Sequence, residues 1–292
     1  MTDSDLRGRT LWDFVFDSER KRPHAEALHD YKKRPGWFPT MKAPSGIHIL
    51  RTRDNIVHDF LYFAETDFDV VSIVDHPLET LYWVEGRRGR RTESHIADLA
   101  LGHRDGSITF IDVRRYWETM TTPGERGRAD ARVQHYREQF GSVYILHDER
   151  KIYPEPLFTN VKEMCELARP QARLRKFERI REDILRMPLP MTVHQIMQAS
   201  TFNAMSTRFE DESPETASIL TEINPVFEVV MDLVASGDLW VDEAQPFAIE
   251  SEIHRTEFTG IRRDRNFVRS FLARNGRTGE ERREHHRLLL PL

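Results

Sequence analysis

The pattern of apolar and polar positions predicts a β-hairpin over residues 94–116. SHIADLAL and SITFIDVRRY are rich in apolar and β-branched residues, and GHRDG lies between them as a turn. Each run carries an aspartate, Asp98 in the first and Asp112 in the second. Arg114 follows Asp112 by two positions, so on a strand both side chains point to one face. Two carboxylates and a cation on neighbouring strands fit a metal-dependent nuclease centre; more commonly, such residues are polar positions on a solvated strand face.

The length of the turn decides whether the two carboxylates meet. A two-residue turn at Asp105-Gly106 sends Asp112 to the face opposite Asp98. A three-residue loop over 104–106, with Gly106 in the left-handed conformation, places Asp98 directly across from Asp112. Asp-Gly suits both turns. We predict the three-residue loop because it alone brings the carboxylates together.

The elements around the hairpin predict an α/β domain with a small mixed sheet and helices on its faces. Residues 54–66 have helical apolar spacing, with Asp54 as a candidate N-cap. The polar, arginine-rich stretch over 124–140 predicts a helix that ends at Gly141. The strand-like segments are 70–85, interrupted at Pro77, and 141–148.

A second module is predicted in the C-terminal half. Two predicted helices are followed by residues 239–255, which predict two strands around a turn. This order is typical of a winged helix. The acidic stretch that precedes its second helix favours protein contact over DNA for this module. The resulting division is a 1–46 N-terminal extended arm, a 47–170 α/β domain, a 171–190 linker broken by prolines, a 191–258 winged-helix domain and a 259–292 basic tail.

Charge and cysteine content narrow the class of protein. A formal net charge of −5 argues against a polycation that coats nucleic acid, but leaves room for local basic patches. A single cysteine forms no internal disulfide and fits a reducing cytoplasm. We see no signal-peptide core and no apolar run near the roughly 20 residues needed to span a bilayer, so no membrane partner is expected. Five arginines could grip DNA phosphates, four in a predicted loop before the hairpin and one near the end of its second arm: Arg87, Arg88, Arg90, Arg91 and Arg115. A solvated turn explains the loop equally well.

Residues 44–255 resemble the TnsA family, the endonuclease subunit of heteromeric bacterial transposases. The resemblance rests on weak motifs in the right order and spacing. They are VHDFLYFAETDFDVVSIVDHPLETLYW, then IADLAL and FIDVRR, then YILHDERKIYPEPLFTNVKEM, and finally Leu233–Ile253. The resemblance implies a restriction-endonuclease-like PD-(D/E)XK fold followed by a winged helix.

The resemblance also implies a site for Mg²⁺ or Mn²⁺, because family members hold metal with a helix glutamate, two acidic strand residues and a nearby lysine. Carried over, Asp98 and Asp112 are the metal ligands, Arg114 stands at the lysine position and Val57 at the glutamate position. Valine cannot ligate a metal, and arginine is a poor proton acceptor. Other nearby groups have plainer expected roles: an N-cap for Asp54, and solvated surface positions for His58 and His95.

We therefore expect a TnsA-like subunit of a DNA transposition complex with a degenerate, impaired nuclease site. Its expected partners are double-stranded DNA at transposon ends, a DDE-type transposase and an AAA+ ATPase regulator. Two alternatives remain open. One is an active Mg-dependent endonuclease that cuts the 5′ ends of the element, and the other is a non-catalytic adaptor that acts by protein–protein contacts.

Overall fold

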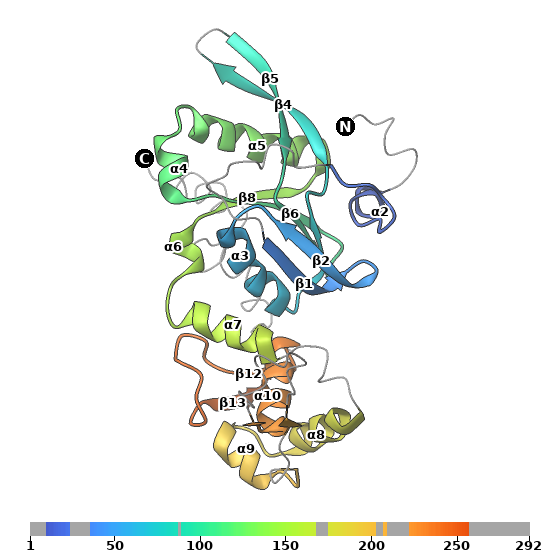
Figure 1. The fold of residues 1–292 in the computed structure, drawn as a ribbon, viewed down its shortest axis with the longest axis vertical. Coiled ribbons are helices and arrows are strands. Elements are labelled where there is room, and N and C mark those ends of the chain that lie inside the picture. Colours follow the sequence, from blue (N-terminus) through green and yellow to red (C-terminus); the bar gives the residue numbers. More distant parts are fainter. Residues whose placement is uncertain are drawn as a thin grey trace, which may run out of the picture. The chain divides into compact units, whose positions relative to one another are not determined.

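The computed structural model describes residues 10–23, 36–86, 89–167, 175–202, 207–208 and 222–256 (Figure 1). The described residues fall into two compact units. The first contains residues up to 65 and 69–154, and the second contains 66–68 and the residues from 155 onward. Within the described ranges, no helix combines the length and apolar character that crossing a membrane requires.

A four-stranded mixed sheet forms the centre of the first unit (Figure 1). Neighbouring strands in the order β3-β6-β7 run antiparallel, and β8 runs parallel to β7. Helix α5 connects β7 to β8, as a parallel crossover requires. The predicted mixed α/β architecture is confirmed; the strands are β3 (Val70–Asp75), β6 (Leu99–His103), β7 (Ile108–Val113) and β8 (Val143–His147), and the helix is α5 (Glu125–Phe140).

The predicted three-residue loop joins β6 to β7. The amide of Gly106 donates to the His103 carbonyl oxygen over 2.9 Å, and the amide of His103 donates to the Ser107 carbonyl oxygen over 2.9 Å. Gly106 has a φ of 81°, in the left-handed region where glycine carries no Cβ penalty. This register places Asp98 across from Asp112, and the Asp98 amide donates to Asp112 Oδ1 over 3.1 Å.

The first arm of the predicted hairpin is not one strand. Residues up to Ile96 belong to β5 (Gly89–Ile96), which pairs with β4 (Glu79–Gly86) in a separate two-stranded ribbon. Strand β6 begins only at Leu99, so Ala97 and Asp98 connect two sheets. The alternating pattern predicted extended chain correctly, but alternation alone does not specify which strand is the partner. Arg90 and Arg91 consequently lie on a strand and not in the predicted loop.

The predicted N-terminal arm over 1–46 is wrong from residue 36 onward, where the chain forms a strand of the first unit; residues 1–9 and 24–35 of the predicted arm lie outside the described residues. Strand β1 (Gly36–Ala43) pairs antiparallel with β2 (Gly46–Thr52), and both contact β3. Phe38 and Leu50 are buried. Pro39 within β1 obscured the strand signal in the sequence, since proline is confined to particular positions in sheets.

Helices complete the first unit. Helix α2 (Leu11–Val15) begins with a capping box between Thr10 and Asp13, and its end packs into the core through Val15 and Phe16. The predicted helix over 54–66 is α3 (Asn55–Thr66), and the Asp54 carboxylate accepts from the Ile56 amide over 3.3 Å, as expected of an N-cap. The remaining helices are α4 (Tyr116–Thr121) and α6 (Glu149–Ile152).

The second unit is helical with a small antiparallel sheet in the order β12-β13-β9. The predicted strand pair near its end exists as β12 and β13. Thr192 caps α9, as the sequence predicts, through a capping box with Gln195. The elements are α7 (Leu157–Leu167), α8 (Arg175–Arg186), β9 (Met191–Thr192), α9 (Val193–Ala199), β10 (Thr207–Arg208), β11 (Glu222–Ile223), α10 (Pro225–Ala235), β12 (Leu239–Trp240) and β13 (Glu252–Arg255).

The segment 171–190 is predicted as a helical connector between domains; the helix exists as α8, but it belongs to the core of the second unit and is not a linker. Its Phe177, Ile180 and Ile184 lie on one helical stripe and are buried against α10 residues such as Val230. The charged composition of this helix hid the stripe. Helix α7 also belongs to this unit, so the boundary lies at 154/155 and not near 170–190. The predicted basic tail over 259–292 lies outside the described residues.

Candidate site: a buried arginine–carboxylate cluster

Asp98 is held by an arginine that the sequence did not single out. Arg53, one residue after β2, donates from Nε to Asp98 Oδ1 and from Nη2 to Asp98 Oδ2 at 2.5 and 2.9 Å. Asp98 Oδ2 also accepts from the Val113 amide over 2.8 Å, and Arg53 Nη2 donates to the Val113 carbonyl oxygen. Arg53 and Asp98 are 3% and 4% exposed. This is a two-pronged guanidinium–carboxylate pair removed from water.

Asp112 lies at the centre of a second set of donors and is fully buried. Its Oδ2 accepts from the Tyr144 hydroxyl over 2.7 Å and lies 2.9 Å from His95 Nε2. The guanidinium groups of Arg132 and Arg114 lie 3.7 and 3.8 Å from the same oxygen. Both Asp112 oxygens are therefore engaged, since Oδ1 accepts from the backbone.

The charge state of Asp112 follows from these neighbours. Burial raises the pKa of its carboxyl, but His95, Arg114 and Arg132 outweigh burial and hold that pKa well below its usual value. Burial and the Asp112 charge raise the pKa of the Tyr144 hydroxyl well above its usual value. Asp112 is therefore an ionised acceptor at neutral pH, and Tyr144 is a neutral donor.

The predicted site residues come together only in part. Asp98 and Asp112 meet at opposed positions, and Arg114, whose side chain is 28% exposed, lies beside Asp112. Val57 is buried in the core on α3, so this position supplies no ligand. Among the described residues, no three His, Cys, Asp or Glu side chains gather closely enough to hold a metal. The donor set does not fit a resident magnesium ion, because a guanidinium already occupies both oxygens of Asp98.

Sequence reasoning missed several members of the cluster. Arg53, Arg132 and Tyr144 come from distant segments, and the available signal was indirect: two carboxylates in apolar strands require buried partners. His95 was expected on the solvated surface but is only 6% exposed. The alternation that suggested exposure does not continue through the break between β5 and β6, so its ring turns inward toward Asp112 and the Tyr136 hydroxyl.

The described members of the predicted DNA-binding set remain on the surface. Arg91 is paired with Glu93. It precedes Ile96, the last residue of β5, by five positions, which is about 17 Å along the strand from the end next to Asp98. Arg90 stacks over the exposed Trp83 ring at 5.0 Å. Arg115 lies 3.3 Å from Asp54. Arg87 and Arg88 lie outside the described residues.

Asp54 and His58 have structural roles. Asp54 caps α3 and pairs with Arg115. His58 is partly exposed and packs edge-on against Phe38 and Tyr62 at ring-centroid distances of 5.2 and 5.4 Å. Neither contributes to the cluster around Asp98.

No protein-family model matches this chain, and no curated protein does. The TnsA resemblance therefore rests on the sequence motifs.

Proposed function

We propose that this chain is a TnsA-like subunit of a DNA transposition complex that binds DNA and partner subunits but does not cut DNA. One observation carries the non-cleaving assignment: Arg53 donates to both carboxylate oxygens of Asp98 inside a nuclease-like sheet.

The chemistry of the Arg53 contacts supports this proposal. A magnesium ion prefers carboxylate and carbonyl oxygens. Arg53 Nη2 takes oxygens of both kinds, from Asp98 and Val113. The side chain is a fixed internal cation that stabilises the opposed strands without supplying an activated water, so the scissile phosphate would lack the metal's charge and its nucleophile.

The fold supports the family assignment. A helix, an antiparallel pair of central strands, a crossover helix and a parallel strand follow in the order expected of a restriction-endonuclease-like domain. In the second unit, helices α9 and α10 with the β12–β13–β9 sheet support a winged helix. This unit is proposed to contact the DDE-type transposase or the AAA+ regulator.

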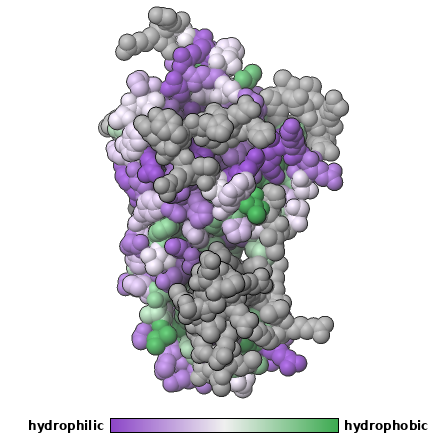
Figure 2. Space-filling view, in the orientation of Figure 1, coloured by the Kyte–Doolittle hydropathy of each residue, from purple (hydrophilic) through white to green (hydrophobic). Residues whose placement is uncertain are grey.

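The β4–β5 ribbon is the proposed DNA-binding element. Its outer positions carry Arg90 and Arg91, and Leu81 and Trp83 on β4 are 59% and 54% exposed. In Figure 1 the ribbon extends beyond the central sheet, where a duplex backbone has access to it. Among the coloured residues of Figure 2, hydrophilic ones predominate.

Metal binding and plasmid nicking test the non-cleaving assignment. Titration calorimetry with Mn²⁺ is expected to show no binding at millimolar concentration. Supercoiled plasmid incubated with Mg²⁺ or Mn²⁺ and the partner transposase is expected to show no nicking that depends on this chain's Asp98. Nicking that Asp98→Asn abolishes would overturn the assignment and favour the active endonuclease.

DNA binding is tested separately by fluorescence anisotropy with a duplex at low salt. Arg90→Gln with Arg91→Gln is expected to weaken binding to all DNA sequences. The slope of log affinity against log salt concentration should fall by the equivalent of about two phosphate contacts. Arg186→Gln, at a 78% exposed side chain of the second unit, is the matched control. No binding by the wild-type chain, together with co-purification of the transposase or ATPase, would favour the adaptor.

A further inference from the structure

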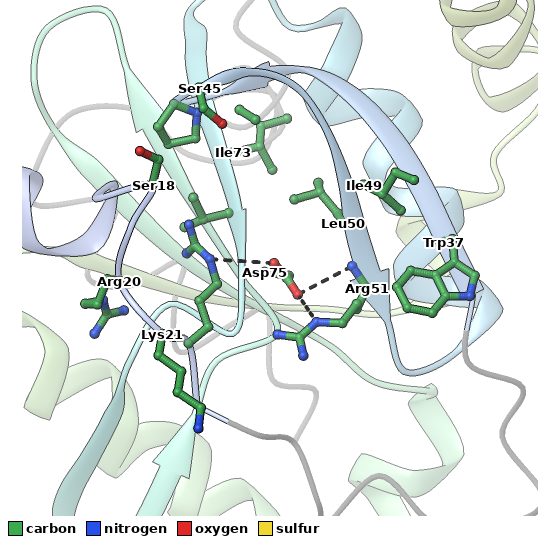
Figure 3. Close-up of a pocket in the computed structure, with 14 residues that line it drawn as sticks. Ser18, Arg20, Lys21, Trp37, Ser45, Ile49, Leu50, Arg51, Ile73 and Asp75 are labelled. Atoms are coloured by element: carbon green, nitrogen blue, oxygen red, sulfur yellow. Dashed lines mark hydrogen bonds and ion pairs between the residues drawn. The ribbon is translucent and has the colours of Figure 1, made fainter.

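A basic cavity lies in the first unit, apart from the Asp98 cluster. Its volume is about 400 Å³, within the range of small-molecule sites. The segment after α2, the β1–β2 hairpin and strand β3 supply its walls. Figure 3 shows Arg20 and Lys21 on one side and Trp37 and Arg51 on the other, with Asp75 between them.

The cavity has an excess of positive charge. Four basic side chains line it, Arg20, Lys21, Arg22 and Arg51, against the single carboxylate of Asp75. That carboxylate is already neutralised: Arg51 Nε lies 2.8 Å from its Oδ2 and Arg22 Nε lies 3.9 Å from its Oδ1. Burial raises the pKa of Asp75, but the His76 and Arg51 hydrogen bonds outweigh burial and lower that pKa to about 2.

Two of the arginines have donors left over. Nε and Nη2 of Arg20 and Nη1 of Arg22 are buried without a hydrogen-bond partner among the described residues. Burial and the neighbouring Arg22 lower the pKa of Arg20 to about 10, so crowding and desolvation oppose its charge. Buried guanidinium N–H groups left unpaired are costly. These three are closed off from solvent, so they reach an oxyanion in the cavity only after the two side chains turn toward it. The hydroxyls of Ser18 and Ser45 line the same cavity.

An aromatic surface adjoins the cations. Trp37 is paired across the hairpin with Arg51, so the two side chains lie beside each other on the sheet. Trp37 is 67% exposed, and the neighbouring Ile49 is 54% exposed. An exposed indole at the edge of a basic cavity offers a stacking surface for a nucleobase.

We propose that this cavity binds a nucleotide unit, with the phosphate on Arg20, Arg22 and Arg51 and the base against Trp37. The phosphate offsets the excess positive charge of the lining, and it pairs with the donors of Arg20 and Arg22 once these side chains turn toward the cavity. Lys21 and the serine hydroxyls complete its surroundings. The ligand is either a free nucleotide or the phosphorylated end of a nucleic-acid strand, because both present the same chemical group. This site is independent of the proposed lack of cleavage.

Calorimetry on the full chain tests the phosphate part. Deoxyadenosine monophosphate is expected to bind at least tenfold more tightly than deoxyadenosine. Arg20→Gln with Arg22→Gln is expected to lower that affinity at least tenfold, and Arg186→Gln to leave it unchanged. Equal affinity for nucleoside and nucleotide, or no effect of the double substitution, overturns the proposal. Thermal unfolding checks that the double variant folds.

The base-stacking part has its own test. Trp37→Ala is expected to weaken deoxyadenosine monophosphate about tenfold and to leave inorganic phosphate unchanged; an equal effect on both ligands overturns the role of Trp37. Single-stranded oligonucleotides with a 5′-phosphate or a 5′-hydroxyl then distinguish the sources. Tighter binding of the phosphorylated strand than of the mononucleotide identifies a strand end, and the reverse identifies a free nucleotide.

Discussion

Arg53 and Asp98 form a two-pronged ion pair in the interior, although 45 positions of sequence separate them. The pair joins the end of the β1–β2 hairpin to the start of β6. Arg53 also donates to the carbonyl oxygen of Val113, the last residue of β7. Three segments are thus tied together at one guanidinium. The same pair that engages both carboxylate oxygens of Asp98 therefore also links these segments.

Removing the carboxylate of Asp98 should be strongly destabilising. Asp98→Ala leaves Arg53 as a buried cation without its counter-ion, and breaking such a pair costs about 3–5 kcal/mol of unfolding free energy. Urea denaturation followed by circular dichroism measures the loss. The control is Glu182→Ala, which breaks the exposed Arg186–Glu182 pair and should cost less than about 1 kcal/mol. Similar losses for the two variants would contradict the structural role of Asp98.

Two tyrosines that donate to aspartates, one buried and one exposed, allow a matched comparison of stability. Tyr144→Phe removes a buried donor to Asp112 and should lower the free energy of unfolding by about 1–3 kcal/mol. Tyr153→Phe removes a similar bond to Asp59, at 2.6 Å, from a residue that is 40% exposed. Water replaces that bond, so its loss should be smaller. Equal denaturation midpoints for the two variants would mean that Asp112 does not depend on Tyr144.

The sequence predicted the local geometry of the opposed carboxylates. Asp-Gly before a β-branched run indicated the turn, and requiring Asp98 to face Asp112 selected the loop that the structure has. The same reasoning did not reach Arg53, because nothing near it in sequence marks it as a partner of Asp98. Long-range ion pairs follow from the packing of whole elements, which a single local pattern does not encode.

Two other differences have the same origin. In α8, arginines and glutamates surround Phe177, Ile180 and Ile184, so the sequence predicts a helical connector between domains although the apolar stripe is regular. His95 was assigned to the solvent by alternation, but the chain changes sheets two residues later and its ring packs inside. In each case the tertiary partner, and not the local pattern, decided the outcome.

His147 should make the fold sensitive to mild acid. Burial lowers the pKa of its imidazole to about 3, whereas the unfolded chain titrates near 6.5. Below pH 6.5 the unfolded state therefore binds a proton that the folded state excludes, and stability falls with pH by up to about 1.4 kcal/mol per unit until roughly pH 3. The contribution is fully present above pH 6.5. His147→Leu should flatten the dependence of unfolding free energy on pH between 6 and 4; an unchanged slope would contradict this assignment.

Gly102 should control the docking of α2. A Cβ at this position would collide with Trp12 Cη2 and lie 2.8 Å from Phe16 Cζ, so Gly102→Ala must shift these two rings and loosen the docking of α2. We expect a loss of about 1–3 kcal/mol and faster trypsin cleavage at the segment after α2. Gly127→Ala in α5 meets nothing within 4 Å and should be neutral or stabilising. Ser18 and residues 20–22 follow α2 and line the basic cavity, so Gly102→Ala should also weaken the binding of deoxyadenosine monophosphate. Adding Trp12→Leu to the same chain should restore binding in part. Unchanged cleavage and nucleotide affinity in Gly102→Ala would show that α2 does not depend on this contact.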